Sequence, residues 1–414
     1  MSRRGWAATL VVAAALLAGS FVLVHHAGWY AHRALTDVGG YHRDEHAIAA
    51  GQVPYRDFPL EYPPAALVAF LAPAALPWSY GTSFAVVMFL SGVACLVAAA
   101  LVLDAVDAEP GRVWFALGFV AIAPLALGAL FDTRFDLWPA ALAVGALAAV
   151  LRRRAGVGGV LLGLGFAAKL WPVVLAPLLL AYAWRRWGRH AAFVGSVSFA
   201  ATVVVCFAPF AVLAPGGVWH SLTAQLRRPL QVESLGAATL MALHHAGGVT
   251  LRTVTTHGSQ NLAGSTADAV GTISTVLVLV LVASVWIGFG RRREPSGDAL
   301  ILACAAAVAV CVAFSKVFSP QFLIWLVPLV PLVRGRRGLV ASVLLGAALL
   351  LTQTWFSHHY WALALDYATP WSWLLLARDL AVVALVVTLA WPGREPLPEH
   401  HARLAAFQAI RPRA

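Results

Sequence analysis

Acidic residues are concentrated in one segment that follows the first apolar run of the chain. These residues are Asp37, Asp44, Glu45, Asp57 and Glu61. A carboxylate at an apolar boundary can serve as a general base, because desolvation raises its pKa toward the working pH. A hydroxyl group that attacks an electrophile must lose a proton, so this segment is a candidate site for that chemistry.

Lysine is rare in this chain, since only Lys169 and Lys316 are lysines among 29 basic residues. Both are expected at helix ends, away from the arginine clusters. A compact ammonium group suits phosphate binding, and the alternative is a side chain that reaches from a helix end to the membrane surface. Further polar candidates for substrate binding, predicted on the same side, are Tyr41, Asp57, Glu61, Tyr62, Arg134, Asp136, Gln231, Glu233, Ser319, Gln321, His358 and His359.

The composition predicts that these residues are positioned by helices in a membrane. The chain of 414 residues is 61% hydrophobic and only 11% charged, whereas soluble domains carry about 25% charged residues. A helix needs about 20 apolar residues to cross the hydrocarbon core. Twelve runs reach or approach that length: 5–26, 82–103, 113–130, 137–151, 156–169, 171–184, 190–213, 269–290, 298–315, 320–333, 338–356 and 371–391. We therefore expect an all-α polytopic protein, with 1–414 as a single integral membrane domain.

Arginine clusters predict the orientation of these helices. They occur at 3–4, 152–154, 185–186, 291–293 and 334–337, and clusters next to membrane helices mark cytoplasmic loops. Both termini are then cytoplasmic, 392–414 is a short basic cytoplasmic tail, and 27–81 and 214–268 are external loops. The proline-interrupted stretch 62–77 is short for a span, so we expect an interfacial or re-entrant helix there.

Several classes of function are disfavoured by the pattern. The basic residues form separate clusters, whereas a nucleic-acid site needs a contiguous basic stripe. The four cysteines lie in apolar runs without paired spacing, which indicates neither a disulfide nor a zinc site. Glycine-rich phosphate loops of the nucleotide-binding kind do not occur. We predict no cofactor, and the sequence indicates no metal.

A series of short motifs carries a more specific signal. In order, they are Asp37-x-x-x-Tyr41 followed by Gly51, Pro54-Tyr55-Arg56-Asp57-Phe58, Glu61-Tyr62-Pro63-Pro64, Arg134-Phe135-Asp136, Gly163 to Pro172 around Lys169, Gln231-Val232-Glu233-Ser234, and Lys316 to Phe322 before Trp325. Together they resemble the GT-C polytopic glycosyltransferases. The resemblance is strongest to glycosyltransferase family 87, which includes polyprenyl-phosphomannose-dependent mannosyltransferases.

The resemblance implies a GT-C fold in the plasma membrane. It also implies inverting transfer of a sugar, mannose first among the alternatives, from a polyprenyl-phosphate donor to a hydroxyl group of a lipid or glycan acceptor on the external face. The acidic residue after the first membrane helix, Asp37, is then the general base, although the pair Asp44 and Glu45 leaves open which carboxylate acts. The leaving phosphate gains negative charge and requires cations placed beforehand, for which Lys169, Lys316 and Arg134 are candidates.

Two competing hypotheses are a transporter or lipid flippase and an inactive lipid-binding scaffold. A transporter should carry ionisable residues near the bilayer midplane on broken helices, whereas this chain places them in loops at one face. The enzyme hypothesis makes a spatial prediction: the acids of the first external loop and the two lysines, which are distant along the chain, meet in one pocket.

Overall fold

The computed structural model describes residues 2–30 and 35–390, so the predicted tail 392–414 lies outside the described residues. Within this part of the chain, eight helices are long and apolar enough to cross a membrane. They are α1 (Arg3–His26), α4 (Tyr80–Ala105), α5 (Pro110–Leu127), α10 (Arg189–Leu213), α13 (Ser265–Gly290), α14 (Gly297–Phe314), α16 (Gly335–Asp366) and α17 (Thr369–Ala390). The prediction of a multi-pass membrane protein is confirmed.

The remaining four predicted spans are shorter than a full crossing. They correspond to α7 (Leu137–Leu151), α8 (Ala155–Ala168), α9 (Ala176–Trp187) and the broken segment Pro320–Leu332, which contains α15 (Leu323–Leu326). Proline explains two of the interruptions, because its ring removes a backbone donor and clashes with the preceding turn. Pro172 lies in the first turn of a 3-10 helix ahead of α9, and Pro328 follows the end of α15 by two residues. The structure therefore does not show twelve full-length spans.

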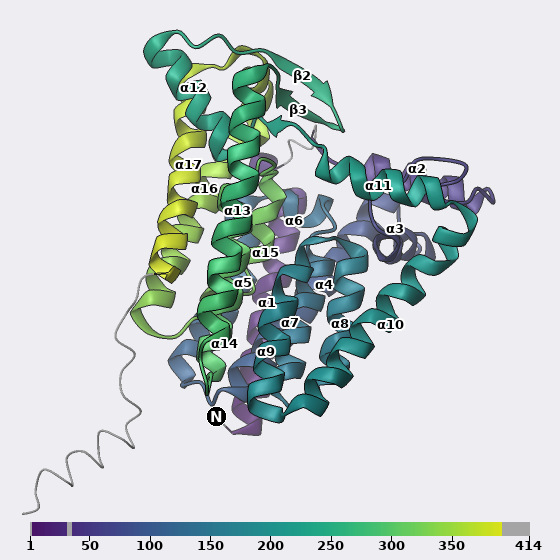
Figure 1. Ribbon diagram of the computed structural model, residues 1–414, viewed down its shortest axis with the longest axis vertical. Helices are drawn as coiled ribbons and strands as arrows, with labels where there is room; N and C mark the ends of the chain where they lie inside the picture. The colour runs from purple at the N-terminus through teal and green to yellow at the C-terminus, as the bar shows by residue number, and fades with distance from the viewer. Residues whose placement is uncertain (1, 31–34, 391–414) are drawn as a thin grey trace, which may run out of the picture.

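Central and peripheral helices differ in what surrounds them. Most residues of α7 and α14 are buried against other helices. In contrast, none of the most apolar window of α10 and little of that of α13 is buried inside the protein. Long apolar surfaces of this kind are stable only against lipid. Figure 1 shows α10 and α13 on the outside of the helix bundle.

Small residues allow α8 and α10 to pack closely. A side chain at Gly159 would come within 2.2 Å of the carbonyl oxygen of Gly195, and one at Gly163 within 2.8 Å of Thr202. The spacing Gly-x-x-x-Gly on α8 therefore provides a flat surface on which α10 lies. Close backbone approach of this kind is a common means of helix association in membranes.

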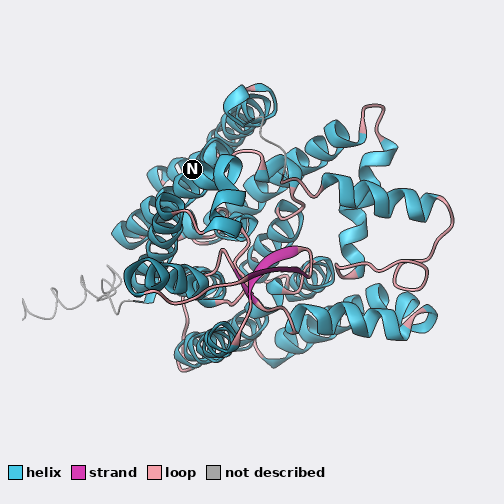
Figure 2. Ribbon diagram, turned by 90° about the horizontal axis from the view of Figure 1, so that it is seen from above, coloured by secondary structure: helices cyan, strands magenta, loops and turns pink. Residues whose placement is uncertain are grey.

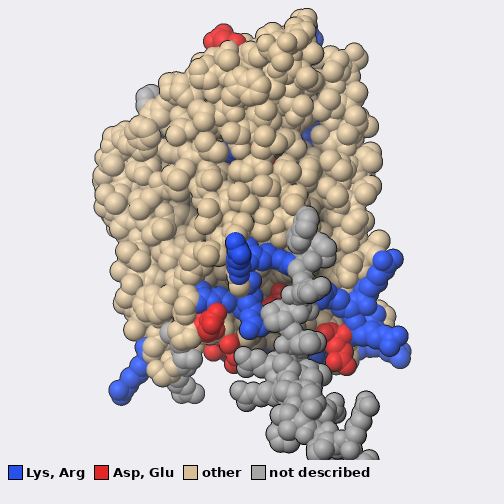
Figure 3. Space-filling view, turned by 90° about the vertical axis from the view of Figure 1, so that its left-hand side faces the viewer, with Lys and Arg blue, Asp and Glu red and all other residues tan. Residues whose placement is uncertain are grey.

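The arginine clusters gather at one end of the bundle. They lie at the starts of α1 and α16, in the last turn of α9, and in the connections before α8 and α14. Figure 3 shows basic residues concentrated at the lower end of the face that it draws. This grouping agrees with the prediction that all the clusters share one side. That this side is cytoplasmic stays a prediction.

The opposite end carries the long loops and their short elements. The first loop contains α2 (Val38–Ala49), which ends before Gly51 with its positive φ, and the broken apolar helix Pro64–Ala75, which contains α3 (Leu67–Leu71). The broken helix agrees with the short helix predicted within 62–77. The second loop contains α11 (Pro215–Leu226) and α12 (Leu235–Gly247).

In the part of the chain that the structure describes, one small sheet accompanies the helices. It consists of β1 (Leu230–Gln231), β2 (Thr253–Thr256) and β3 (Ser259–Leu262), antiparallel in the order β1-β3-β2. The turn residues His257 and Gly258 both have positive φ, which is the backbone twist that tight hairpins favour. Seen from above, the sheet lies between groups of helices, over the middle of the molecule (Figure 2).

Candidate active site

A cavity of about 720 Å³ opens at the loop-bearing end of the molecule. Its size is within the usual range for small-molecule sites. Its walls include most of the residues singled out from the sequence, namely Asp37, Tyr41, Glu61, Tyr62, Arg134, Lys169, Gln231, Glu233, Ser319 and Gln321. The structure thus brings Asp37 and Lys169, which are far apart in the sequence, to one cavity.

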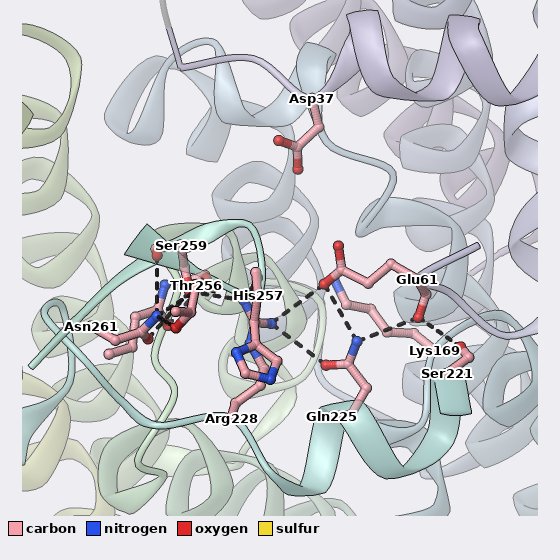
Figure 4. A network of polar contacts seen from close by, with 12 residues as sticks. Asp37, Glu61, Lys169, Ser221, Gln225, Arg228, Thr256, His257, Ser259 and Asn261 are labelled. Atoms are coloured by element: carbon pink, nitrogen blue, oxygen red, sulfur yellow. Dashed lines mark hydrogen bonds and ion pairs between the residues drawn. The ribbon is translucent and has the colours of Figure 1, made fainter. Parts of the chain in front are cut away.

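Asp37 lies immediately before α2 and is held by two neighbours. The guanidinium group of Arg134 forms an ion pair with its Oδ2, and the hydroxyl group of Tyr41 donates to the same oxygen at 3.3 Å. Arg134 is buried, and burial lowers its pKa to about 10. Both of these contacts use Oδ2 of the carboxylate. In Figure 4 the carboxylate points from the start of α2 into the space bordered by Glu61 and Lys169.

Lys169 is anchored in the wall of the cavity. It directly follows α8, and its Nζ donates to Oδ1 of Asp136 at 2.7 Å. Trp325 donates its indole N–H to the same oxygen at 2.6 Å. Burial lowers the pKa of Lys169, and Asp136 opposes that shift. Asp136 is almost completely buried behind the wall, so its direct contact is with Lys169 and Trp325.

Aromatic rings surround this ion pair. The Lys169 ammonium lies 4.8 Å from the centre of the Phe135 ring and 5.4 Å from that of Phe322. Phe322 stacks on Trp325 at 4.1 Å, and Trp325 stacks on Trp171 at 4.9 Å. Cation–π attraction partly replaces the hydration that the ammonium group loses. The stacked rings give the cavity a flat apolar surface next to its charged groups.

Glu61 joins the first loop to the second. Its carboxylate accepts a hydrogen bond from Gln225 at 3.3 Å and lies 3.6 Å from Arg228. Arg228 also donates to the backbone oxygen of His257 at 3.0 Å, and to Ser259. Figure 4 shows this network running from α11 to the hairpin of β2 and β3. It holds a basic side chain at the cavity wall.

The sequence interpretation missed Arg228 and Gln225. A signal was present, because Arg228 is one of the few arginines predicted on the external side, outside the clusters.

Close approach of the backbones also holds the first and second loops together, since a side chain at Gly217 would lie 2.0 Å from the carbonyl oxygen of Tyr55. Only glycine fits at that contact.

Gln231, Glu233 and Ser319 form a second part of the wall. Gln231 donates to the hydroxyl group of Ser319 at 2.9 Å. Burial raises the pKa of Glu233 to about 7, and a hydrogen bond with the hydroxyl group of Tyr360 opposes the shift. Among the described residues, its Oε2 has no hydrogen-bond partner. This oxygen is itself buried.

A buried arginine on α17 supports the Glu233 loop. Arg378 donates to the backbone oxygen of Glu233 at 2.7 Å and pairs with Asp379 at 3.0 Å. The ring of Phe318 lies 3.8 Å from its guanidinium carbon. The sequence interpretation missed this pair too, although two adjacent charges inside the run 371–391 are the kind of feature that points to function in a membrane.

Two other candidates, Asp57 and Lys316, have partners away from the cavity. Asp57 pairs with Arg56 at 2.9 Å and accepts from the backbone of Val53, so it stabilises its own turn. These contacts lower the pKa of Asp57. Lys316 donates to the backbone oxygen of Leu226 at 3.0 Å. The predicted meeting of both lysines is therefore wrong for Lys316, because its ammonium group closes a loop contact instead.

The histidines of α16 lie outside the cavity wall as well. His359 stacks on Trp371 at 3.7 Å, and His358 packs against Trp29. α16 is kinked at His359, whose backbone is not helical. Tyr360 and Trp361, directly after the kink, line the cavity together with Phe356.

The second acidic pair is divided between two surroundings. Asp44 lines the cavity, and burial raises its pKa to about 6. Glu45 lies instead beside His42 and His46 on another face of α2. Of the two carboxylates that compete with Asp37 as a base, only Asp44 therefore reaches the cavity.

The fold and the cavity define a multi-pass membrane protein with a polar site at one end of its helices. The sequence profile of glycosyltransferase family 87 matches residues 60–320, which is more than half of the chain. The chain belongs to this family and is a glycosyltransferase. The matched range contains Glu61, Arg134, Lys169 and Glu233, while Asp37 precedes it. No curated protein matches the sequence.

Proposed function

We propose that this enzyme transfers a sugar, with mannose as the first candidate, from a polyprenyl-phosphate donor to a hydroxyl group of a lipid or glycan acceptor. The reaction takes place on the external face of the plasma membrane and inverts the anomeric carbon. The observation that carries the proposal is one cavity that contains a partly exposed carboxylate, Asp37, together with the cations Arg134, Lys169 and Arg228.

Asp37 is the general base in this mechanism. The ion pair with Arg134 favours the ionised form of Asp37, and a carboxylate must be ionised to accept a proton. The acceptor hydroxyl group gives its proton to Oδ1 of Asp37 while its oxygen attacks the anomeric carbon. The bond from that carbon to the phosphate oxygen breaks, and its electron pair stays on the phosphate.

Basic side chains stabilise the leaving phosphate. Arg228 and Arg134 line the cavity from opposite loops, and each presents several donors to phosphate oxygens. Lys169 adds positive charge from the wall, although its Nζ is already bonded to Asp136. Groups held in place before the reaction stabilise developing charge without reorganisation.

The external orientation is supported by the arrangement of charge. The arginine clusters lie at the end of the bundle opposite the cavity, and such clusters mark the cytoplasmic side. The outer surfaces of α10 and α13 suit lipid, so a lipid-linked donor can reach the cavity through the membrane.

The test is transfer by purified protein in lipid nanodiscs with radiolabelled polyprenyl-phosphate mannose and membrane glycolipid acceptors. Asp37→Asn should lower kcat about 10²- to 10⁴-fold while donor binding persists. Asp57→Asn is the matched control, because Asp57 pairs with Arg56 outside the cavity, and its rate should stay near that of the wild type.

An Asp37→Asn variant that turns over at the wild-type rate would exclude Asp37 as the base, and Asp44→Asn would then be measured in the same assay. A panel of polyprenyl-phosphate donors, one of which carries arabinofuranose, tests which sugar the enzyme transfers. Transfer from another lipid-linked sugar, with none from mannose, would correct the donor.

A further inference from the structure

A group of potential metal ligands lies on the face of α2 that points away from the cavity. Glu45 and His46 follow His42 by three and four residues, the spacings at which side chains are neighbours on a helix surface. Asp37 and Tyr41, at the start of the same helix, line the cavity instead. The two faces of α2 therefore carry different chemistry.

The three side chains converge closely enough for one ion. Nε2 of His42 lies 3.8 Å from Oε2 of Glu45, and Nδ1 of His46 lies 4.0 Å from the same oxygen. One ligand atom from each residue lies within 4.8 Å of the others. Zinc binds nitrogen and oxygen ligands at about 2.0–2.2 Å, so ligands in a tetrahedral site are about 3.3 Å apart. Small side-chain rotations on a fixed backbone cover the difference.

Packing holds these ligands in position. The ring of His42 stacks on that of Tyr80 at 4.2 Å, and the hydroxyl group of Tyr80 donates to the backbone oxygen of Phe70 at 2.9 Å. The preceding residue, Tyr41, stacks on Phe70 at 4.3 Å. α2 is thus fixed on both α3 and α4. A site is precise when its ligands are carried by packed, regular elements.

The side chains of the three potential ligands differ in solvent exposure, so that one side of the group is buried and the other is open. The Glu45 side chain is only 12% exposed, while that of His46 is 69% exposed. The carboxylate forms the base of the group and the second imidazole forms its open side. Arg43, the basic neighbour on the same helix, lines the cavity on the other face. An ion can therefore enter from solvent and neutralise the carboxylate.

We propose that His42, Glu45 and His46 bind one divalent transition-metal ion of the zinc class. Two imidazoles and one carboxylate suit zinc, cobalt or nickel, whereas calcium and magnesium prefer oxygen ligands alone. Water completes the coordination. The ion joins two turns of α2 and stiffens the helix that carries Asp37 and Tyr41. It lies outside the cavity, so it takes no part in the bond-breaking step, and the inference goes beyond the proposed function.

The experiment measures metal binding by the full-length protein in detergent after chelation and removal of the chelator. Zinc and cobalt are titrated by calorimetry, and visible absorption of bound cobalt reports nitrogen and oxygen ligation. The wild type should bind one ion. Loss of an outer partner of a metal ligand costs about 10- to 100-fold in affinity, so Glu45→Gln and His46→Gln should lose at least that factor.

His220→Gln is the matched control, because His220 is an exposed histidine at the same end of the molecule. Its affinity should equal that of the wild type. Zinc should also raise the thermal midpoint of the wild type but not of His46→Gln, since a ligand that binds only the folded state stabilises it. The midpoints without metal show whether each variant is folded.

Two results would overturn the proposal. One is a wild type that takes up no stoichiometric ion, in which case the histidines only pair with Glu45. The other is equal affinity in the wild type and in both ligand variants. Metal binding is measured without any sugar, and Asp37→Asn should bind the ion normally, so failure here is distinct from failure of the proposed sugar transfer.

Discussion

Ion pairs at the two ends of the helix bundle differ in how far solvent reaches them. At the cavity end, the side chains of Asp136 and Lys169 are 1% and 14% exposed. At the arginine-rich end, those of Arg152 and Asp104 are 39% and 49% exposed, although their charged atoms are as close, at 2.5 Å. The distance between the charged atoms therefore does not distinguish a buried ion pair at the cavity from an exposed ion pair at the surface.

The difference between these pairs is energetic. An exposed pair contributes about 0–1 kcal/mol, because water already stabilises both charges. Removing one partner of a buried pair costs about 3–5 kcal/mol, because the other charge stays in a poorly solvated place. The exposed pair therefore lies in solvent at the arginine-rich end, and the buried pair lies in and behind the wall of the cavity.

The largest stability effect is expected from Lys169→Met. The variant leaves Asp136 buried with the indole N–H of Trp325 as its hydrogen-bond donor, so folding should lose about 3–5 kcal/mol. The thermal midpoint in detergent measures this loss. Adding Asp136→Asn removes the uncompensated charge, so the double variant should recover part of it. A single variant as stable as the wild type would contradict the importance of burial at this end.

An intermediate and pH-dependent effect is expected from Glu233→Gln. Burial raises the pKa of Glu233 from 4.5 to about 7, so between these values the unfolded chain releases a proton that the folded protein keeps. Stability then falls as pH rises through this window, by at most about 1.4 kcal/mol per pH unit. The amide has no such titration. The variant should match the wild type near pH 5 and have the higher thermal midpoint at pH 8.

Glu109→Gln is the control for that pH series, because Glu109 is exposed at the opposite end. It should leave the pH dependence of the wild-type midpoint in place. Parallel pH curves for the wild type and Glu233→Gln would mean that the Glu233 carboxyl group is not perturbed by burial.

The smallest effect is expected from Arg152→Gln. Solvent screens the pair with Asp104, so the loss should be less than about 1 kcal/mol, and transfer activity should be unchanged. The same midpoint assay compares it with Lys169→Met. If Arg152→Gln lost as much stability as Lys169→Met, the proposed energetic difference between the exposed and the buried ion pair would be wrong.

Much of the fold follows from local composition. Eight of the predicted spans match helices because about 20 apolar residues in a row have a low free energy only in hydrocarbon. The broken helix 64–75 was also recognisable, since proline interrupts the turn in which it lies. The hairpin around His257 and Gly258 was not, because its strands are only four residues long.

The candidate site was likewise predictable only in part from the sequence. Residue type and order along the chain were enough to select Asp37, Arg134 and Lys169 as functional candidates. They could not distinguish Lys169, whose side chain meets Asp136 in the wall, from Lys316, which closes a loop. Nor could they find Arg228, because its role depends on where α11 lies against the first loop.

What the sequence by itself determined is that the chain is a membrane protein with its arginine clusters at one end and its candidate chemistry at the other, because transfer into lipid depends on each segment's own residues. Tertiary structure alone decided which polar groups share the cavity and which face of α2 carries Glu45 and its histidines. Those outcomes depend on packing between segments far apart in the chain. The burial that results from this packing then determines how much free energy is lost when one member of an ion pair is removed.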